Sequence, residues 1–272
     1  MATSSPETGH PGAPLIEAER RGAVAFLWLN RPALRNAFND EMIRQLSAAL
    51  DGVGDDPTAR VLVLGGRGAA FCAGADLHWM RRMAGYTRAQ NEADARGLAR
   101  MLNKLATFPK PTVARVHGAA FAGGLGLVAA CDMAVAADDT QFAVTEVRLG
   151  LVPATISPYV IRAIGARACS RYFLSGERFD AAEAQRIGLV HLSASTAELD
   201  ARVDALAAQL LLGSPAAQAG VKSLIRDVAD VKVDARLMAM TARRIAAARA
   251  SPEAKEGVQA FLDRRAPHWA AK

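Results

Sequence analysis

The sequence has few cysteines, few aromatic residues and no long apolar run. Three cysteines occur among 272 residues, and no C-x-x-C spacing is present, which argues against a disulfide framework and a zinc site. Uncharged stretches, such as the one between Arg115 and Asp132, fall short of the roughly 18 residues of a membrane helix. Residues 1–13 lack the basic and apolar segments of a signal peptide. We therefore expect a disordered tail over residues 1–13, no membrane span, no metal site and a reducing, cytoplasmic setting.

Hydrophobic residues are plentiful, at 51% of the chain, whereas aromatic residues make up 6%. This composition predicts a buried core rich in Ala, Leu and Val. Lys and Arg number 33 and Asp and Glu number 27, so the formal net charge is +6. The excess fits either a solvated surface or affinity for a phosphate-bearing ligand. Nucleic acid is not favoured, because aromatic residues do not alternate with the basic ones.

The first half of the chain alternates between strand and helix patterns. Strands are predicted over residues 23–30, 60–66, 111–118 and, as a short pair, 133–144. Asn39 is a candidate N-cap for the helix that follows it, and residues 78–108 have helical composition. This alternation predicts an α/β core.

The second half of the chain is predicted to be nearly all helix. Ser-Pro pairs that suit the start of a helix occur at Ser157, Ser214 and Ser251. Asp180 and Glu183 have the spacing of a capping box. We expect an α/β core over residues 14–200 and a helical C-terminal module over residues 201–272.

A glycine pattern between residues 124 and 129 matches the G-x-G-x-x-[GA] fingerprint of dinucleotide sites. That fingerprint requires a strand that runs directly into the first glycine. The predicted strand ends near His117 and Gly-Ala-Ala-Phe-Ala follows it, so we do not expect a dinucleotide site. The sequence also lacks the G-x-x-x-x-G-K-[ST] pattern of a P-loop.

Two glycine-containing segments, residues 66–77 and 117–128, each follow a predicted strand and could each enter a helix. Placed side by side, they could aim two backbone N–H groups at one point and form an oxyanion hole. They could equally be two packing turns. The spacing of the residues leaves both interpretations open.

Five segments together resemble the crotonase family of enoyl-CoA hydratases and isomerases. In chain order they are LNRPALRNAFN (29–39), FCAGADL (71–77), GGLGLVAACD (123–132), FAVTEVRLGLVPATIS (142–157) and EGVQAFLDRR (256–265). The resemblance extends from about residue 15 to residue 268. It implies an α/β spiral of ββα units and a helical C-terminal module that forms trimers, two of which usually stack into a hexamer.

The resemblance also assigns residues to a site. It implies that the N–H groups of Ala75 and Gly123 form an oxyanion hole and that Glu146 is the catalytic carboxylate. The residues implied to bind the adenine and pantetheine parts of CoA are Ala33, Arg35, Ala73, Ala75, Asp76, Leu77, Phe261 and Arg264. CoA would arrive as part of the substrate, with no separate cofactor. Arg264 would give part of the basic excess a purpose, because CoA carries phosphates.

Two positions depart from the family pattern. The hydratases carry a first glutamate where this chain has Gly126, so Glu146 is the one remaining carboxylate. A family glycine whose N–H can hold the reacting water is replaced by Ala154, which retains that N–H. One carboxyl group can act as base and then as acid if the water bridges both reacting carbons. Apolar neighbours are expected to raise the pKa of Glu146.

Other polar residues have weaker claims to a role in the site. We expect Asp132 to be structural, His117 to be a packing or capping residue, and Cys72 to be no nucleophile, since it has no evident partner base. His78 follows the implied CoA segment and is a candidate ligand contact. Four residues either line the acyl pocket or pack within a helix: Trp79, Met80, Met83 and Tyr86.

The segment after Glu146, together with Gly126, most resembles the methylglutaconyl-CoA hydratase-like branch of the family. This implies reversible hydration of an enoyl-CoA, with a 3-methylglutaconyl-CoA-like substrate, within fatty acid metabolism or leucine degradation. The distal carboxylate of such a substrate, or Arg148, would compensate for the missing glutamate. The alternatives are a Δ3,Δ2-enoyl-CoA isomerase that uses Glu146 alone, and a catalytically weak protein that binds acyl-CoA or nucleic acid.

Overall fold

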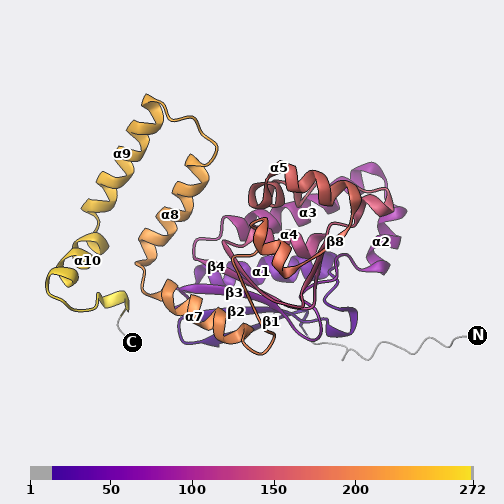
Figure 1. The fold of residues 1–272 in the computed structure, drawn as a ribbon, viewed down its shortest axis with the longest axis horizontal. Coiled ribbons are helices and arrows are strands. Elements are labelled where there is room, and N and C mark those ends of the chain that lie inside the picture. The colour runs from indigo at the N-terminus through magenta and orange to yellow at the C-terminus, as the bar shows by residue number, and fades with distance from the viewer. Residues whose placement is uncertain (1–13, 271–272) are drawn as a thin grey trace, which may run out of the picture.

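The computed structural model describes residues 14–270 and divides them between a sheet-based core and a helical arm (Figure 1). The predicted tail over residues 1–13 lies outside the described residues. The main sheet has the order β1 (Ile16–Arg21), β2 (Val24–Leu29), β3 (Val61–Gly66), β4 (Thr112–Val116), β6 (Met133–Ala137) and β9 (Leu192–Ala194). A smaller sheet has the order β5 (Ala119–Phe121), β7 (Gln141–Ala143) and β8 (Arg178–Asp180). Strand neighbours are parallel except in the pairs β1–β2 and β7–β8.

Apolar side chains alternate between the two faces of the main sheet, as the two-residue period of a strand requires. In β2, Phe26 and Trp28 point into one buried cluster, whereas Leu27 and Leu29 point into the other. The larger cluster also takes in residues of the core helices, among them Leu102 and Leu125. The main sheet is therefore buried on both sides, which is typical of parallel sheets in α/β proteins.

Most of the helices pack on this core. The core helices are α1 (Asp40–Asp55), α2 (Leu77–Ala84), α3 (Arg88–Ala106), α4 (Gly123–Ala130), α5 (Ser157–Ser175), α6 (Ala181–Arg186) and α7 (Leu199–Leu211), with short 3-10 turns η1 (Pro32–Leu34) and η2 (Glu146–Leu149). α7 packs against the outer face of the main sheet through Leu199, Val203 and Ala207. The predicted boundary between residues 200 and 201 therefore falls inside a helix that covers the sheet.

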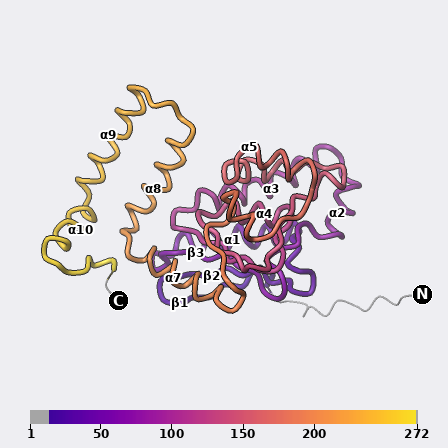
Figure 2. Tube along the Cα trace, in the orientation of Figure 1, coloured from indigo at the N-terminus to yellow at the C-terminus, as the bar shows by residue number. Residues whose placement is uncertain are grey.

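The chain leaves the core after α7 and forms an arm. The arm consists of α8 (Pro215–Val228), α9 (Ala235–Ala250), α10 (Pro252–Leu262) and the 3-10 turn η3 (His268–Ala270). Figure 2 shows α9 and α10 standing away from the core. α9 has no buried residue and α10 has only Ala260. The arm is thus held by few contacts within its own chain.

Several local predictions are confirmed by the helix ends. The side chain of Asn39 accepts a hydrogen bond from the Met42 N–H, and Ser214 and Ser251 cap α8 and α10 in the same way. Asp180 caps α6. The second half of its predicted capping box is wrong, because the Glu183 carboxylate bonds to Arg186 and Tyr172 instead.

Other local predictions are wrong. Ser157 is not an N-cap, because α5 begins with Ser157 itself and its hydroxyl donates to the carbonyl of Ala154. By contrast, the helical composition predicted over residues 78–108 is confirmed, and the stretch forms two helices, α2 and α3, since Thr87 starts a new helix with a full capping box. The sequence pattern predicts no strand at β1, β5, β8 or β9. Strands β5, β8 and β9 are only three residues long, and none of the four shows a clear alternating pattern.

Candidate active site

The two glycine-containing segments lie side by side. The Cys72 N–H donates to the Ala119 carbonyl at 2.9 Å, and the Phe121 N–H donates to the Cys72 carbonyl at 3.0 Å. These bonds form a short parallel bridge between Cys72 and Ala120. Of the two interpretations that the sequence leaves open, this arrangement allows the oxyanion hole, because both segments reach the same edge of the small sheet.

The N–H of Ala75 has no hydrogen-bond partner among residues 14–270. Phe38 pairs with the residues on either side of it: the Phe38 N–H donates to the Gly74 carbonyl at 2.9 Å, and the Asp76 N–H donates to the Phe38 carbonyl at 3.0 Å. In such a parallel bridge the middle residue points its own N–H away from the partner strand. The Ala75 N–H is therefore free to bind an oxygen atom.

Gly123 supplies a second N–H without a hydrogen-bond partner among residues 14–270, because it is the first residue of α4 and the first turn of a helix has no internal partner for its donors. Ala122, just before it, is held at φ 49° and ψ −119°, and its N–H donates to the Ala143 carbonyl at 2.8 Å. A non-glycine residue in that region stores strain, which is common at functional sites.

Phe38 links the two donors. Its backbone brackets Ala75, and its ring lies so close to Gly123 that a Cβ there would fall 2.1 Å from the ring carbon Cζ. The Phe38 ring also packs on Trp79 at 6.1 Å between ring centres. Sequence reasoning missed this role of Phe38, since no local pattern reveals that one ring supports two distant backbone groups.

Glu146 opens η2, three residues after Ala143, whose carbonyl holds Ala122. Its carboxylate oxygen Oε2 is buried and has no hydrogen-bond partner in the described chain. Burial raises the pKa of Glu146 above its ordinary value, as predicted, and no neighbouring charged side chain contributes to the shift. The structure thus holds a half-buried carboxyl group with an unused oxygen.

The position of the missing glutamate is filled by a side chain. A Cβ on Gly126 would lie 2.2 Å from Cγ2 and 2.8 Å from Cβ of Ile156. Ile156 is 1% exposed, and it precedes α5, which packs against both α4 and η2. The glycine at residue 126 therefore leaves no empty gap, because the apolar side chain of Ile156 fills the space over it, which the sequence alone could not reveal.

The expectation for Ala154 is wrong in one respect. Its N–H does not point freely into the site, because it donates to the carbonyl of Val152 at 2.8 Å. The family role of holding a water molecule is therefore not available to this N–H in the described conformation.

The residues implied to bind CoA fall into two groups. The first group surrounds the oxyanion segment: the Ala73 N–H donates to the Arg35 carbonyl at 2.9 Å, and Ala33, Arg35 and Leu77 are exposed. Asp76 belongs to this group by position. Its carboxylate, however, is engaged in capping α2 and in an ion pair with Arg31 at 3.0 Å.

The second group, Phe261 and Arg264, lies in the arm. Figure 1 places α10 and α2 at opposite ends of the longest axis, so one chain does not bring these residues to the site. Phe261 is 82% exposed. The predicted role of both residues remains a prediction.

Asp132 lies where the arm meets the core. Its carboxylate accepts hydrogen bonds from the backbone and hydroxyl of Thr112 at 2.8 and 2.9 Å, and forms an ion pair with Lys222 at 2.5 Å. The predicted structural role of Asp132 is thereby explained, because it joins α8 to the core.

The remaining polar candidates also have structural partners. His117 bonds to the Gly68 carbonyl at 2.8 Å, and burial lowers its pKa. Burial raises the pKa of the Cys72 thiol to about 12, which suits a packing residue rather than a nucleophile.

Two residues that follow the oxyanion segment differ in exposure. Trp79 is buried and its indole N–H donates to Asp94, whereas His78 is exposed.

The predicted gap between the strand that ends near His117 and the glycines is wrong. Residues 119–121 form strand β5, so a strand does run almost directly into the glycines. A Cβ on Gly124 would fall 2.6 Å from the Cys72 carbonyl oxygen. This glycine therefore serves close packing of α4 rather than approach of a pyrophosphate.

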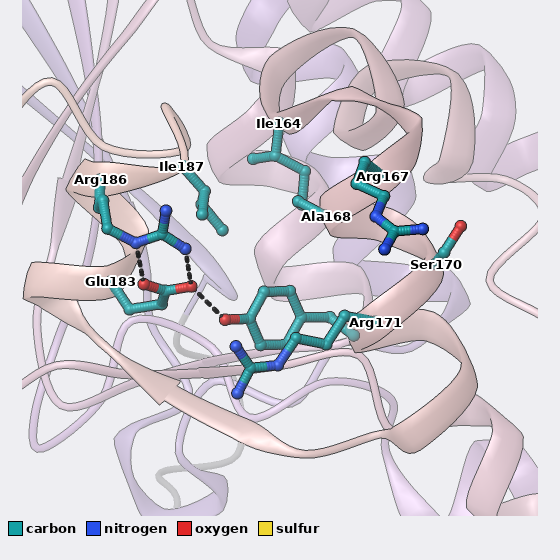
Figure 3. A pocket seen from close by; sticks show the side chains of 9 residues that line it. Ile164, Arg167, Ala168, Ser170, Arg171, Glu183, Arg186 and Ile187 are labelled. Carbon is teal, nitrogen blue, oxygen red and sulfur yellow. Dashed lines mark hydrogen bonds and ion pairs between the residues drawn. The ribbon is translucent and has the colours of Figure 1, made fainter.

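A separate cavity of about 640 Å³ lies between α5 and α6 (Figure 3). It is lined by Arg167, Arg171 and Arg186, but two of these are engaged. Arg186 forms a fork with the Glu183 carboxylate at 2.5 and 2.7 Å, and Arg171 bonds to Glu177 at 2.6 Å. The hydroxyl of Tyr172 on α5 donates to the same Glu183 carboxylate, and this contact joins α5 to α6 (Figure 3).

Comparisons with known proteins agree with this geometry. The family described as Enoyl-CoA hydratase/isomerase matches residues 19–272. A 2,3-dehydroadipyl-CoA hydratase of Escherichia coli is 33% identical, over 92% of this chain and 96% of its own. An enoyl-CoA hydratase structure from Shewanella pealeana is 41% identical, with a TM-score of 0.91 over 94% of this chain and 96% of its own. Pseudomonas aeruginosa AtuE is 36% identical, with a TM-score of 0.90 over 94% of this chain and all of its own.

This chain belongs to the enoyl-CoA hydratase/isomerase family and has the crotonase fold. The predicted family and the predicted α/β fold class are therefore confirmed. In residues 14–270 no helix is long and apolar enough to cross a membrane. Within the same residues, no group of three or more His, Cys, Asp or Glu could hold a metal ion.

Proposed function

We propose that this protein adds water reversibly across the Cα–Cβ double bond of an enoyl-CoA thioester. The observation that carries the proposal is the buried, unpartnered Oε2 of Glu146 in the same site as two free backbone donors. A buried polar atom without a protein partner is costly and requires an explanation, and a catalytic role is one that fits a carboxylate at this position.

The chemistry follows from these groups. The Glu146 carboxylate takes a proton from water while the water oxygen bonds to Cβ, and the π electrons move onto the thioester oxygen. The N–H groups of Ala75 and Gly123 stabilise this enolate oxygen. The protonated Glu146 then delivers a proton to Cα, so one carboxyl group acts as base and then as acid. Its raised pKa favours this double use, because it holds the proton more readily than an exposed glutamate does.

The substrate that we propose is a 3-methylglutaconyl-CoA-like thioester, on the basis of the resemblance of residues 146–165 to that branch. Such a substrate carries a distal carboxylate, and Arg148 is exposed close behind Glu146. We also propose, on the basis of the family resemblance, a cytoplasmic location, CoA contacts at the residues named above, and assembly through the arm as a trimer or hexamer.

Double-bond migration is a second candidate, because the site described here contains one carboxylate and no acid at residue 126. The two reactions give products of different mass, because only hydration adds a water molecule to the substrate. Purified protein is incubated with 2-enoyl-CoA, 3-enoyl-CoA and 3-methylglutaconyl-CoA, and the products are identified by mass spectrometry. A gain of one water supports hydration, whereas an unchanged mass with a shifted double bond supports isomerisation.

Glu146→Gln tests the role of the carboxylate. We expect turnover to fall by roughly 10²–10⁴-fold, with the fold intact by circular dichroism. The matched control is Glu92→Gln, an exposed glutamate on α3, which should retain wild-type turnover. Wild-type turnover in the Glu146 variant would show that the mechanism is wrong.

The pH dependence has a definite sign. Burial raises the folded pKa of Glu146 above its ordinary value of 4.5, so kcat/KM should rise with pH through a limb that lies above 4.5.

The protonated form of Glu146 is favoured in the folded state, so its stabilising contribution is present below pH 4.5 and is lost as pH rises through the folded pKa. Glu146→Gln should therefore be more stable than wild type at pH 7, with no difference below pH 4.5. Equal unfolding midpoints at both pH values would contradict the assignment.

A further inference from the structure

Trp79 supports the ring of Phe38. The two rings pack at 6.1 Å between their centres, and both side chains are 4% exposed. The indole N–H of Trp79 donates to the Asp94 carboxylate on α3 at 3.2 Å, and the backbone N–H of Trp79 donates to the Asp76 carboxylate at 3.0 Å. The position of the indole is therefore fixed, because the side chain and the backbone of Trp79 each have a carboxylate partner.

The contact reaches the oxyanion hole through Phe38. The tip of the Phe38 ring fills the place of a Cβ on Gly123, since that Cβ would lie 2.1 Å from Cζ and 2.7 Å from Cε1 of the ring. The Phe38 backbone bonds to the residues on either side of Ala75. A shift of the Phe38 ring would therefore change the position of the Gly123 N–H relative to the Ala75 N–H.

The Phe38 ring can shift only if its surroundings give it space. Trp79 and Phe38 belong to the same closely packed cluster, and a smaller side chain at residue 79 would open a cavity beside the ring. The turn into α4 would then relax, because Ala122 is held at φ 49° and keeps this strain only while its surroundings are fixed.

We propose that Trp79 is a positioning residue, which holds the Phe38 ring so that the N–H groups of Ala75 and Gly123 meet one thioester oxygen. This inference rests on the proposed function and goes beyond it, because it assigns a catalytic effect to a side chain that acts through another residue. An oxyanion hole stabilises the developing enolate more than the bound substrate. Loss of the alignment should therefore lower kcat and leave KM unchanged.

The kinetic test is Trp79→Leu, measured with the enoyl-CoA that the wild type converts fastest. We expect kcat to fall roughly 10–100-fold with KM unchanged, because a misplacement of about 1 Å can cost about 10²-fold in rate. A side chain that lined the acyl pocket would instead change KM. A change in KM with kcat unchanged would therefore overturn the proposal.

The matched control is Trp28→Leu. Trp28 is 5% exposed and its indole N–H also donates to a carboxylate, that of Glu19, but Trp28 belongs to the separate cluster on the outer face of the main sheet. The variant should lower the unfolding temperature, as Trp79→Leu does, and leave kcat unchanged. Equal losses of kcat in the two variants would mean that general destabilisation is the cause, and would overturn the proposal.

A second measurement tests the alignment without turnover. Acetoacetyl-CoA ionises to an enolate that absorbs in the near ultraviolet, and two aligned N–H donors favour the enolate form. At fixed pH, the enolate fraction of the bound ligand should fall in Trp79→Leu and keep its wild-type value in Trp28→Leu. An unchanged enolate fraction in Trp79→Leu would contradict the role of Trp79.

Trp79→Phe separates the ring contact from the hydrogen bond. The variant keeps a smaller ring against Phe38 and loses the bond to Asp94, so kcat and the enolate fraction should lie between the values of the wild type and of Trp79→Leu. Wild-type values in Trp79→Phe would show that the bond to Asp94 does not position the ring. Values equal to those of Trp79→Leu would show that the ring contact has no effect, and either result would overturn the proposal.

The two kinds of failure can be told apart. If the wild type converts no enoyl-CoA, the proposed function fails, and the enolate fraction still tests the alignment. If the wild type converts an enoyl-CoA and Trp79→Leu keeps its kcat, the proposed function stands and the role of Trp79 fails.

Discussion

The core and the helical arm bury their apolar side chains to very different extents. In the core, both faces of the main sheet are covered, and residues such as Leu62, Leu64 and Leu102 are fully buried. In the arm, α8 buries only Lys222 and α9 buries nothing, while Phe261 and Val258 are 82% and 62% exposed. The core is stabilised by its own chain, whereas the arm presents apolar surface of the kind that marks a contact with another molecule.

The difference also explains how the site is built. Ala75, Gly123 and Glu146 all belong to the core, where close packing and hydrogen bonds hold the backbone in place. The arm is attached to the core mainly through single polar contacts. Lys222 forms an ion pair with Asp132, and Arg60 donates hydrogen bonds to the carbonyls of Gly213 and Trp269. Three predictions test this contrast.

The largest effect is expected where the arm is joined to the core. Lys222→Met leaves the Asp132 carboxylate without its ion-pair partner. Loss of one member of a buried pair costs roughly 3–5 kcal/mol, and we expect the lower end of that range because the Asp132 side chain is 25% exposed. Urea unfolding of the variant measures the loss. Lys232→Met, at an exposed position between α8 and α9, is the control and should change stability by less than about 0.5 kcal/mol. An equally small loss in both variants would mean that the arm is not anchored by Lys222.

A matched pair of truncations compares the two regions directly. Leu102→Ala in the core should cost roughly 2–5 kcal/mol, since it leaves a cavity in a closely packed cluster. Phe261→Ala in the arm should cost less than about 0.5 kcal/mol in dilute protein, because its ring is mostly in water. Unfolding midpoints at several protein concentrations check this. A loss for Phe261→Ala that grows with concentration would sharpen the contrast, by showing that another copy covers the arm.

The smallest effect distinguishes two Ser-Pro pairs. The Ser251 hydroxyl caps α10 by accepting from the Ala254 N–H at 3.1 Å, so Ser251→Ala should cost about 1 kcal/mol. Ser157 caps nothing, and Ser157→Ala should cost less than about 0.5 kcal/mol. Thermal unfolding followed by circular dichroism resolves the two. The reverse order would show that Ser157, not Ser251, stabilises its helix.

Helix caps and long strands could be predicted, because they arise from interactions within short stretches of the chain. Asn39, Asp180, Ser214 and Ser251 cap helices because their side-chain oxygens reach N–H groups a few residues along the same chain. The long apolar strands β2 and β3 follow from their composition, and the family follows from five ordered motifs. Glu146 is assigned through the family resemblance, and burial in the folded chain raises its pKa as expected.

Features that depend on contacts between distant segments could be seen only in the folded chain. Phe38 aligns Ala75 with Gly123, and Ile156 occupies the space over Gly126, although each contact joins segments that no sequence periodicity relates. Likewise, Ser157 and Ala154 have residue types suited to their expected roles, but the tight turns at Pro153 use their polar groups otherwise. Caps and strands arise from short-range hydrogen bonding and side-chain alternation, whereas the shape of a site arises from packing, which the order of residues does not reveal until the chain is folded.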